Sequence, residues 1–565
     1  MAKAEANVEE LVGKIERGEL RLPEMQRRYV WRSTRVRDLM DSLYRGYPSG
    51  AILLWETGED VPLQEFAVPQ QANPYRNTQL LLDGQQRLTS LSAVIRGEPV
   101  TVRGRKKPIE LLFNLEHPEQ LAVVTEVNED ADDDDGDDND QDPDASDDDL
   151  LRRFNKMVFV VATKKLEQMP QWVRVTDVFK TDSDGEFLRR AGVTSFEDPR
   201  YDKYSKRLSR LRGVRKYVYR MDVLERSLSY NEVTEIFVRV NSLGAKLRSS
   251  DLALAQITAK WPGALKTFQA AQEQCGFDID LGLHLRNLVA FTTNQSRFLS
   301  VGNLPIDSLK QAWKQCVPGI EFAVNFLKNN AGIYSPGLLS SPYLLVTLGY
   351  FGHARKYAIA SAEGRALRQW ALLANAKGRY SRGSSETLLD QDLATIRDGG
   401  GAPDLLDRLR LQVGRLDIAP EELEGRNQRS ALFKTMFLAF RDAGARDWRS
   451  NLVIAMDHKG STHKLQFHHI FPKAILKKHF TAREADDIAN LAFIGGRTNR
   501  QILAARPDVY VAEHLQKAGH GAFEAQCIPV EPELLEVGSY KRFLAERRRL
   551  ISLRLNEFLE FTASP

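Results

Sequence analysis

The acidic segment from Glu129 to Asp149 is the feature that most limits how this chain can fold. It reads EDADDDDGDDNDQDPDASDDD and carries 14 acidic residues with no lysine or arginine. A segment so charged and so poor in apolar side chains cannot bury a core of its own. We therefore expect a solvated insertion at 129–149 that interrupts a folded domain. A second interpretation is an acidic decoy that occupies a basic nucleic-acid groove until the true ligand displaces it.

The acidic segment offsets most of the net positive charge that the rest of the chain carries. The full sequence of 565 residues has a formal net charge of +3, from 79 basic and 76 acidic residues. Without the segment, 79 basic residues stand against 62 acidic ones, which is a net charge of +17. An excess of this size makes a polyanion such as DNA a reasonable partner.

Several classes of protein are disfavoured. No apolar run approaches the roughly 18 residues that a bilayer-spanning helix needs, and the N-terminus lacks a signal-peptide core. Cys275, Cys316 and Cys527 are far apart and form no CxxC pair, which argues against a zinc knuckle or a disulfide framework. We expect a cytoplasmic protein with no membrane partner.

Hydrophobic patterning divides the chain into three regions. Apolar runs of strand length at 51–56, 79–84 and 110–115 accompany an apolar stripe from Val36 to Leu43 that stops at Gly46. Strand patterns return at 157–162 and 216–224, whereas residues 251–430 are mostly helical in pattern. We predict an α+β protein with an α/β domain at 1–250, a helical middle region at 251–430 and a third domain at 431–565.

The third region concentrates the histidines. Seven of the ten lie between His458 and His520, and His468 and His469 are adjacent in the apolar setting FHHIFP. We predict a strand at 464–471, a strand at 491–495 and a helix from about Thr498. Neighbouring side chains on a strand point to opposite faces. One histidine can therefore face a metal while the other faces a phosphodiester, whose hydrolysis needs a base and a cation. A structural histidine pair is the alternative.

The order His468, His469, Asn490, Asn499 resembles the HNH, or ββα-metal, nuclease family. The resemblance implies that His469 is the general base and His468 a metal ligand. It further implies that Asn490 orients the base and that Asn499 is a second metal ligand, where a histidine is commoner. Two such ligands favour Mg²⁺ or Mn²⁺ over a three-histidine zinc site. Nearby basic residues are expected to contact DNA, namely Lys473, Arg497 and Arg500.

A second candidate site follows the predicted strand at 79–84. The strand ends at Asp83, Gly84 permits a tight turn, and a helix begins with Gln85, Gln86 and Arg87. Free backbone N–H groups at a helix N-terminus, with an arginine in the first turn, can bind a phosphate. An ordinary polar helix start is the alternative.

Four segments together resemble the N-terminal domain of GmrSD-type, modification-dependent (type IV) restriction endonucleases, a domain related to the ParB/sulfiredoxin-like fold. They are LPEMQRRYVW (22–31), LMDSLYRGYPSGAILLWE (39–56), LLDGQQRLTSL (81–91) and IFVRVNSLGAKL (236–247). The resemblance implies a nucleoside triphosphate (NTP) bound and hydrolysed at Asp83–Arg87, with Gln26 and Arg27 as neighbours. No P-loop motif GxxxxGK[ST] occurs.

These observations predict an NTP-regulated, metal-dependent DNA endonuclease that restricts modified foreign or phage DNA. One nuclease site cuts one strand at a time, so a double-strand break would require a homodimer or two encounters. Two alternatives remain open: an NTP-switched DNA-binding or signalling protein with a non-catalytic HNH scaffold, and an NTP-independent toxin nuclease.

Overall fold

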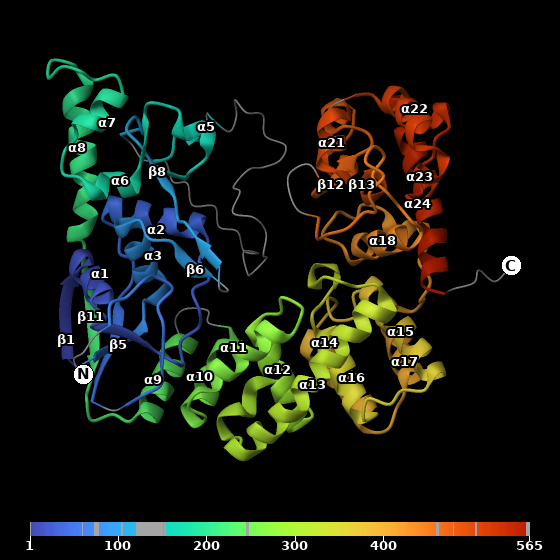
Figure 1. The fold of residues 1–565 in the computed structure, drawn as a ribbon, viewed down its shortest axis with the longest axis horizontal. Coiled ribbons are helices and arrows are strands. Elements are labelled where there is room, and N and C mark those ends of the chain that lie inside the picture. The colour runs from blue at the N-terminus through green and yellow to red at the C-terminus, as the bar shows by residue number, and fades with distance from the viewer. Residues whose placement is uncertain are drawn as a thin grey trace. The chain divides into compact units, whose positions relative to one another are not determined.

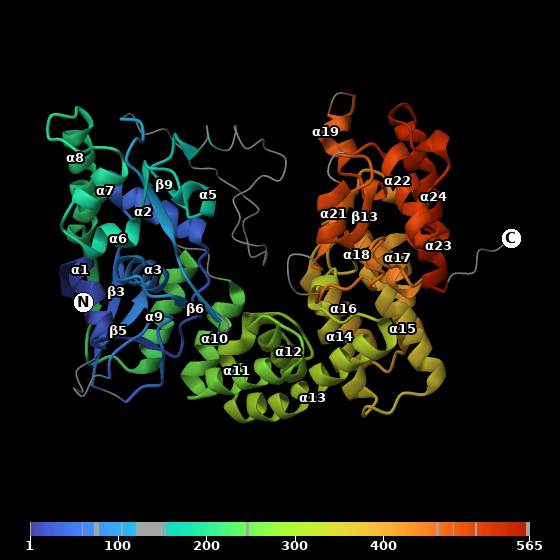
Figure 2. The ribbon, with the colours of Figure 1, turned by 45° about the horizontal axis from the view of Figure 1, so that its top comes forward.

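The computed structural model describes residues 2–58, 60–72, 78–102, 105–119, 151, 154–243, 248–458, 463–477, 479–502 and 505–560 (Figures 1 and 2). Contacts divide the chain into two compact units, Met1–Leu265 and Lys266–Pro565. The acidic segment 129–149 lies outside the described residues. None of the helices within the described ranges combines the length and the apolar composition needed to cross a bilayer.

A mixed sheet forms the centre of the N-terminal unit. Among the described residues six strands join in the order β1-β11-β3-β5-β2-β4. Their bounds are β1 (Ala2–Asn7), β2 (Leu20–Pro23), β3 (Ile52–Thr57), β4 (Leu63–Gln64), β5 (Thr78–Asp83) and β11 (Val218–Leu224). β11 pairs with β3 and β5 pairs with β2 in parallel, and the other neighbours are antiparallel. The predicted strands at 51–56, 79–84 and 216–224 are confirmed within one or two residues at each end.

Side chains on both faces of this sheet are buried. Successive side chains on a strand point to opposite faces, so each face packs against its own set of helices. Leu54 and Leu81 join a cluster with side chains of the helices α1 (Val8–Glu16), α2 (Ser33–Arg45) and α3 (Gln85–Arg96). Trp55 and Leu80 point the other way and pack against α9 (Tyr230–Leu243) and α10 (Ser249–Lys260). The helix α2 ends at Gly46, whose φ of 77° is the left-handed conformation predicted for its stop.

A smaller sheet joins the chain on either side of the acidic segment. In the part of the chain that is described, β10 (Trp172–Arg174), β8 (Leu111–Asn114) and β9 (Phe159–Val161) pair in that order. β8 and β9 are antiparallel, with Leu111 opposite Val161. The acidic segment therefore occurs in the connection between two paired strands. The region also contains the helices α5 (Lys164–Glu167), α6 (Val175–Lys180), α7 (Gly185–Arg190) and α8 (Arg200–Arg212). The strands β6 (Val100–Val102) and β7 (Arg105–Lys107) pair with each other.

The predicted boundary after residue 250 and the division by contacts after Leu265 differ. The reason is that α10 covers one face of the N-terminal sheet, where Ala255 is fully buried. Asp251 of α10 also accepts a hydrogen bond from Arg27 at 3.2 Å. The division of the remaining chain into a helical middle region and a nuclease domain stays a prediction.

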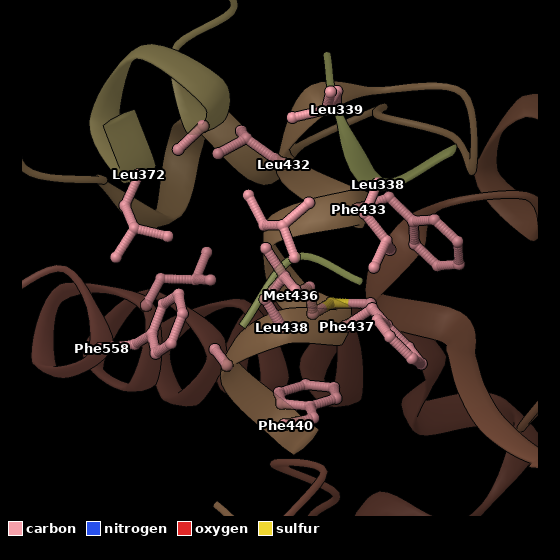
Figure 3. Close-up of a cluster of buried hydrophobic side chains, with 14 of the residues drawn as sticks. Leu338, Leu339, Leu372, Leu432, Phe433, Met436, Phe437, Leu438, Phe440 and Phe558 are labelled. Atoms are coloured by element: carbon pink, nitrogen blue, oxygen red, sulfur yellow. The ribbon is translucent and has the colours of Figure 1, made fainter. Parts of the chain in front are cut away.

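The second unit is mostly helical, as the patterning at 251–430 predicts. Before residue 443 its α-helices are α11 (Ala264–Gln274), α12 (Leu281–Thr293), α13 (Ile306–Ala331), α14 (Tyr343–Ala354), α15 (Ser361–Ala376), α16 (Ser385–Arg397), α17 (Ala402–Val413) and α18 (Ala431–Asp442), among the described residues. One cluster of buried side chains runs through the unit, from Cys275 to Leu559. Figure 3 shows α18 side chains such as Met436 in one cluster with Leu372 of α15 and Phe558 of the last helix. Helices of the middle region and the C-terminal segment thus share a core.

The C-terminal segment contains a β-ribbon followed by a helix. In the described residues, β12 (Leu465–His469) and β13 (Leu491–Gly495) form an antiparallel pair, and α21 (Gly496–Ile502) follows directly. The ribbon lies between α21 and the group α22 (Pro507–Ala518), α23 (His520–Glu524) and α24 (Tyr540–Phe558), as Figures 1 and 2 both show. The connection holds α19 (Lys473–Leu476) and α20 (Ala482–Ala485). The terminal helix α24 packs on this region, since Phe543, Ile551 and Leu555 are fully buried.

Candidate functional site

The two adjacent histidines sit at the end of β12, opposite the start of β13. His468 is paired with Ala492 and His469 with Leu491 in the antiparallel register. Because the side chains alternate, His468 is 3% exposed, whereas the side chain of His469 is 25% exposed. The ribbon thus separates a buried imidazole from one that reaches the surface, as the pattern FHHIFP predicts.

His468 connects β12 to two helices. Its Nδ1 atom lies 2.9 Å from the side-chain oxygen of Asn499 on α21, and its Nε2 atom lies 3.1 Å from the hydroxyl of Tyr510 on α22. The Tyr510 hydroxyl donates its proton to the carbonyl of Ile470 at 2.9 Å. With the Tyr510 proton on this carbonyl, the hydroxyl accepts from Nε2–H of His468 and Nδ1 keeps a lone pair. Burial lowers the pKa of His468 to about 4, which keeps the ring neutral.

His469 contacts a carboxylate that sequence reasoning did not identify. Its Nε2 atom lies 3.0 Å from Oδ1 of Asp486, and the same oxygen accepts an ion pair from Lys473 at 2.8 Å. Burial raises the pKa of Asp486, but the hydrogen bonds from Lys473 and His469 outweigh it, so the pKa lies below its ordinary value. Asp486 is thus held as an anion beside the imidazole, where it stabilises the protonated ring.

Asn490 fixes the backbone that follows the histidine pair. It is fully buried, its side-chain oxygen accepts from the Phe471 N–H at 2.8 Å, and its amide donates to the Phe471 carbonyl at 3.1 Å. A further bond runs from the amide to the Ala485 carbonyl at 2.9 Å. These contacts hold the loop just after His469, which is the position that the resemblance implied for Asn490.

A buried aspartate fixes the start of α21. Asp447 accepts from the Gly495 N–H at 2.7 Å and from the Thr498 hydroxyl at 2.9 Å. Burial raises its pKa, but hydrogen bonds from the backbone of Ser450 and Gly495 outweigh this effect and lower it overall. Asp447 thereby sets the direction in which α21 presents Asn499.

Arg547 of α24 holds the backbone at the start of β13. Its guanidinium is fully buried and donates to the carbonyls of Ala489 at 2.7 Å and Leu491 at 2.8 Å, on either side of Asn490. It also donates to the carbonyls of Gln526 at 3.1 Å and Cys527 at 3.2 Å. The terminal helix therefore holds the start of β13 through hydrogen bonds to four carbonyls.

The basic residues predicted to contact DNA have different surroundings. Arg497 and Arg500 are on α21, where their side chains are exposed or nearly so. Lys473 is half-buried, and its ammonium group pairs with Asp486 beside His469. Within the described ranges, no group of three or more His, Cys, Asp or Glu side chains could hold a metal ion. The candidate metal site thus consists of one imidazole and one amide.

The segment Asp83–Arg87 is organised mainly by its own contacts. Gly84 has a φ of 99°, and a Cβ there would lie 2.5 Å from the Ile52 side chain, so glycine is required. The Arg87 guanidinium donates to the carbonyls of Ser49 at 2.6 Å and Ala51 at 2.7 Å and to Asp83 at 3.0 Å. Arg87 therefore braces the turn between β5 and α3 against the residues just before β3. The Asp83 side chain is 44% exposed.

Two of the glutamines predicted to meet a nucleotide, Gln26 and Gln86, hydrogen-bond to neighbouring backbone. The Gln86 side-chain oxygen accepts from the Val30 N–H at 2.9 Å, and its amide donates to the Arg28 carbonyl at 3.2 Å. Gln26 is buried and donates to the carbonyl of Leu81 at 3.2 Å. Gln85 is buried beside Gln86. The structure thus brings together the 26–31 loop and the 83–87 segment, with Arg27 pairing with α10.

Four residues that sequence reasoning missed take part in the C-terminal site: Asp447, Asp486, Tyr510 and Arg547. Asp486 lies 17 residues after His469, and Arg547 lies 58 residues after Ala489. No short motif joins them to the histidine pair. Only the acidic character of DD at 486–487, four residues before Asn490, could have indicated a partner for the base.

Comparison with known proteins adds evidence for the N-terminal half. The chain is 23% identical over 571 residues to an uncharacterized protein of Methanocaldococcus jannaschii, MJ0686, and the alignment covers 94% of this chain and 90% of that protein. Residues 8–258 match the model of the GmrSD restriction endonuclease, N-terminal domain. The segment that holds the six-stranded sheet and Asp83–Arg87 is therefore similar to the N-terminal domain of GmrSD restriction endonucleases.

Proposed function

We propose that this protein is a metal-dependent DNA endonuclease of the restriction type, with its cutting centre on the ribbon β12–β13 and the helix α21. The similarity of residues 8–258 to a restriction endonuclease domain supports a restriction role. The observation that carries the proposal is the arrangement of His468 against Asn499 and of the adjacent His469 against Asp486. A ribbon and helix with these side chains resembles an HNH nuclease centre.

His469 is the general base in this proposal. It takes a proton from the water that attacks the phosphodiester, because its imidazole reaches the surface and histidine is the side chain that most often acts as a general base. Asp486 stabilises the imidazolium that forms, since the carboxylate is already 3.0 Å from Nε2. Asn490 keeps the loop after His469 in place, so the base holds its position during proton transfer.

His468 and Asn499 are the residues that would hold Mg²⁺ or Mn²⁺. The donor set fits: Nδ1 of His468 keeps its lone pair, and the Asn499 oxygen that faces it at 2.9 Å is a second acceptor. Two acceptor atoms this close repel each other unless a cation lies beside both. Two protein ligands leave the other coordination positions to water and phosphate oxygens, which suits these metals. The bound cation would neutralise charge on the phosphate and on the leaving oxygen.

The N-terminal unit is the regulatory part of the proposal. We infer that it binds and hydrolyses an NTP and senses modified DNA before cutting is allowed, and the support is its similarity to the GmrSD domain. Asp83, Gly84 and Arg87 remain the nucleotide-site residues proposed, together with Arg27. Gln26, Gln85 and Gln86 belong to the same proposed site, where Gln26 and Gln86 also hold the two loops that meet there. A cytoplasmic protein that dimerises for double-strand cutting fits this role.

The test is cleavage of plasmid DNA by the full chain with Mg²⁺ or Mn²⁺, with and without each NTP. Unmodified plasmid is compared with DNA from phage with modified bases and with phosphorothioated DNA. The proposal predicts NTP-dependent nicking or cutting confined to modified DNA. Equal cutting of every DNA without NTP would establish a toxin nuclease instead. NTP hydrolysis and DNA binding without strand breaks in either metal would establish a DNA-binding switch.

A further inference from the structure

A cleft opens beside His469 on the surface of the second unit. It has a volume of about 470 Å³, and its lining includes His469, Asp486, Asn427, Arg429 and Arg483. The loop that supplies Asn427 and Arg429 precedes α18, more than 35 residues before the histidine pair. The catalytic base of the proposed function therefore faces a cavity whose opposite wall comes from another part of the chain.

This loop is fixed against the ribbon region by a buried carboxylate. Asp487, which is 1% exposed, accepts from the Gly425 N–H at 2.9 Å and from the Arg548 guanidinium at 2.6 Å. The Ile488 N–H donates to the Arg426 carbonyl at 2.9 Å. Gly425 has a φ of 64°, and a Cβ there would lie 3.1 Å from the Arg483 guanidinium. The cleft is thus a preformed feature in which a side chain at residue 425 would crowd Arg483.

The positive charge of the cleft is only partly balanced. Arg429 and Arg483 are exposed, and among the described residues neither has a carboxylate within ion-pair distance. Asp486, a carboxylate in the lining, already pairs with Lys473 and contacts His469. Two arginines without a carboxylate partner, beside amides such as Asn427, match the acceptor oxygens of a phosphodiester chain.

We propose that this cleft binds the sugar-phosphate backbone of the DNA strand being cut, with Arg429 and Arg483 contacting phosphates next to the scissile one. The inference rests on the proposed nuclease function and adds the binding site for the strand. A backbone contact carries no sequence information. The cleft would therefore set the position of the strand over His469, and modified bases would be recognised elsewhere in the chain.

The experiment uses the full chain and the variants Arg429→Gln, Arg483→Gln and their combination. Arg365→Gln is the matched control, because Arg365 is an exposed arginine of α15 outside the lining of the cleft. Nicking of the preferred plasmid is measured as kcat/KM over a series of KCl concentrations. Binding of a fluorescein-labelled duplex is measured in EDTA over the same series. Thermal unfolding of each variant shows that the fold is kept.

Each lost phosphate contact lowers kcat/KM about tenfold, as expected for a charge-assisted hydrogen bond. Each also reduces the slope of log(kcat/KM) against log[KCl] by about 1, because fewer counterions are released. The variants Arg429→Lys and Arg483→Lys keep most of the slope. Arg365→Gln changes neither quantity.

The other outcomes separate this inference from the nuclease proposal. If the wild type nicks DNA and the double variant matches it in rate and salt slope, the arginines do not contact the strand and the inference is overturned. If the wild type nicks no DNA but the double variant loses duplex affinity and salt slope, the cleft is a nucleic-acid site and the nuclease proposal fails. If the wild type neither binds nor nicks DNA, both are overturned.

Discussion

The Nδ1 atom of His468 lies 2.9 Å from the side-chain oxygen of Asn499, which joins the first strand of the ribbon to the helix that follows its second strand. The two residues are 31 positions apart in the sequence. Their contact requires the strand pairing of β12 with β13 and the direction of α21 together. It is the relationship on which the proposed metal site depends.

Asn499→Ala should abolish metal-supported nicking. The substitution removes one of the two proposed protein ligands and leaves only Nδ1 of His468. We expect Mg²⁺ or Mn²⁺ affinity to fall by about 10- to 100-fold or more, because even residues outside the ligand set have effects of this size. Mn²⁺ titration followed by thermal shift checks this directly. An unchanged Mn²⁺ response would place the metal elsewhere.

Tyr510→Phe tests the tautomer of His468. The variant keeps the ring but removes the oxygen that accepts from Nε2–H and donates to the Ile470 carbonyl. We expect a loss of about 1–3 kcal/mol in the free energy of unfolding. Metal affinity should fall about tenfold, since Tyr510 no longer holds the imidazole proton on Nε2 and the proton can occupy Nδ1. If stability falls while the Mn²⁺ concentration for half-maximal nicking is unchanged, Tyr510 has only a structural role.

Asp392→Asn should strongly destabilise the helical region of the second unit. Asp392 and Arg379 are 0% and 1% exposed, and the carboxylate also accepts from the Tyr380 hydroxyl at 2.7 Å. Removing the charge leaves the guanidinium buried without a counter-ion, which costs about 3–5 kcal/mol. Denaturant unfolding measures this loss. The control Asp398→Asn breaks an exposed pair and should change stability by less than about 0.5 kcal/mol; equal losses would contradict the account.

Two buried histidines away from the ribbon predict a loss of stability in mild acid. Burial lowers the pKa of His284 to about 4 and that of His117 to about 4. In the unfolded chain both titrate near 6.5, so between about pH 6.5 and pH 4 only the unfolded state takes up these protons. Stability is therefore complete above pH 6.5 and falls as the pH drops towards 4, by up to about 3 kcal/mol for each group.

The measurement is denaturant unfolding of wild type and His284→Leu at pH 7 and pH 5. The His284 Nε2 atom has no hydrogen-bond partner among the described residues, so leucine breaks no bond of that atom. The variant should lose less stability between the two pH values than the wild type. An identical pH dependence in both proteins would show that His284 does not contribute.

The sequence predicted the local elements of the site better than its contacts. The strand at 491–495 agrees with β13 (Leu491–Gly495), and the helix predicted from about Thr498 begins at Gly496. Apolar periodicity and the Asn490 position were enough for this, because each signal lies within a few residues. The contacts of Asp486 and Tyr510 with the histidines could not be predicted, since they depend on how the loop and α22 return to the ribbon.

In the N-terminal half, too, local elements were easier to predict than long-range contacts. The helix stop at Gly46 was predicted from a stripe of four apolar residues. The strand β1 (Ala2–Asn7) was not, because its alternating small and charged residues continue into the helical spacing of α1. Its strand conformation comes from pairing with β11, more than 200 residues later. Likewise the hydrogen bonds of Gln86 with Val30 and Arg28 could not be predicted, because 56 residues or more separate the partners.

The most direct test of the central claim is plasmid nicking by His469→Ala beside the wild type, in Mg²⁺ or Mn²⁺ with NTP, with NTP hydrolysis measured in the same samples. The substitution removes the proposed base but leaves the contact of His468 with Asn499 and the whole N-terminal unit. We predict that nicking falls by at least about 100-fold, as expected for loss of a general base, while NTP hydrolysis is unchanged. Nicking at the wild-type rate would show that the histidine pair is not the cutting centre.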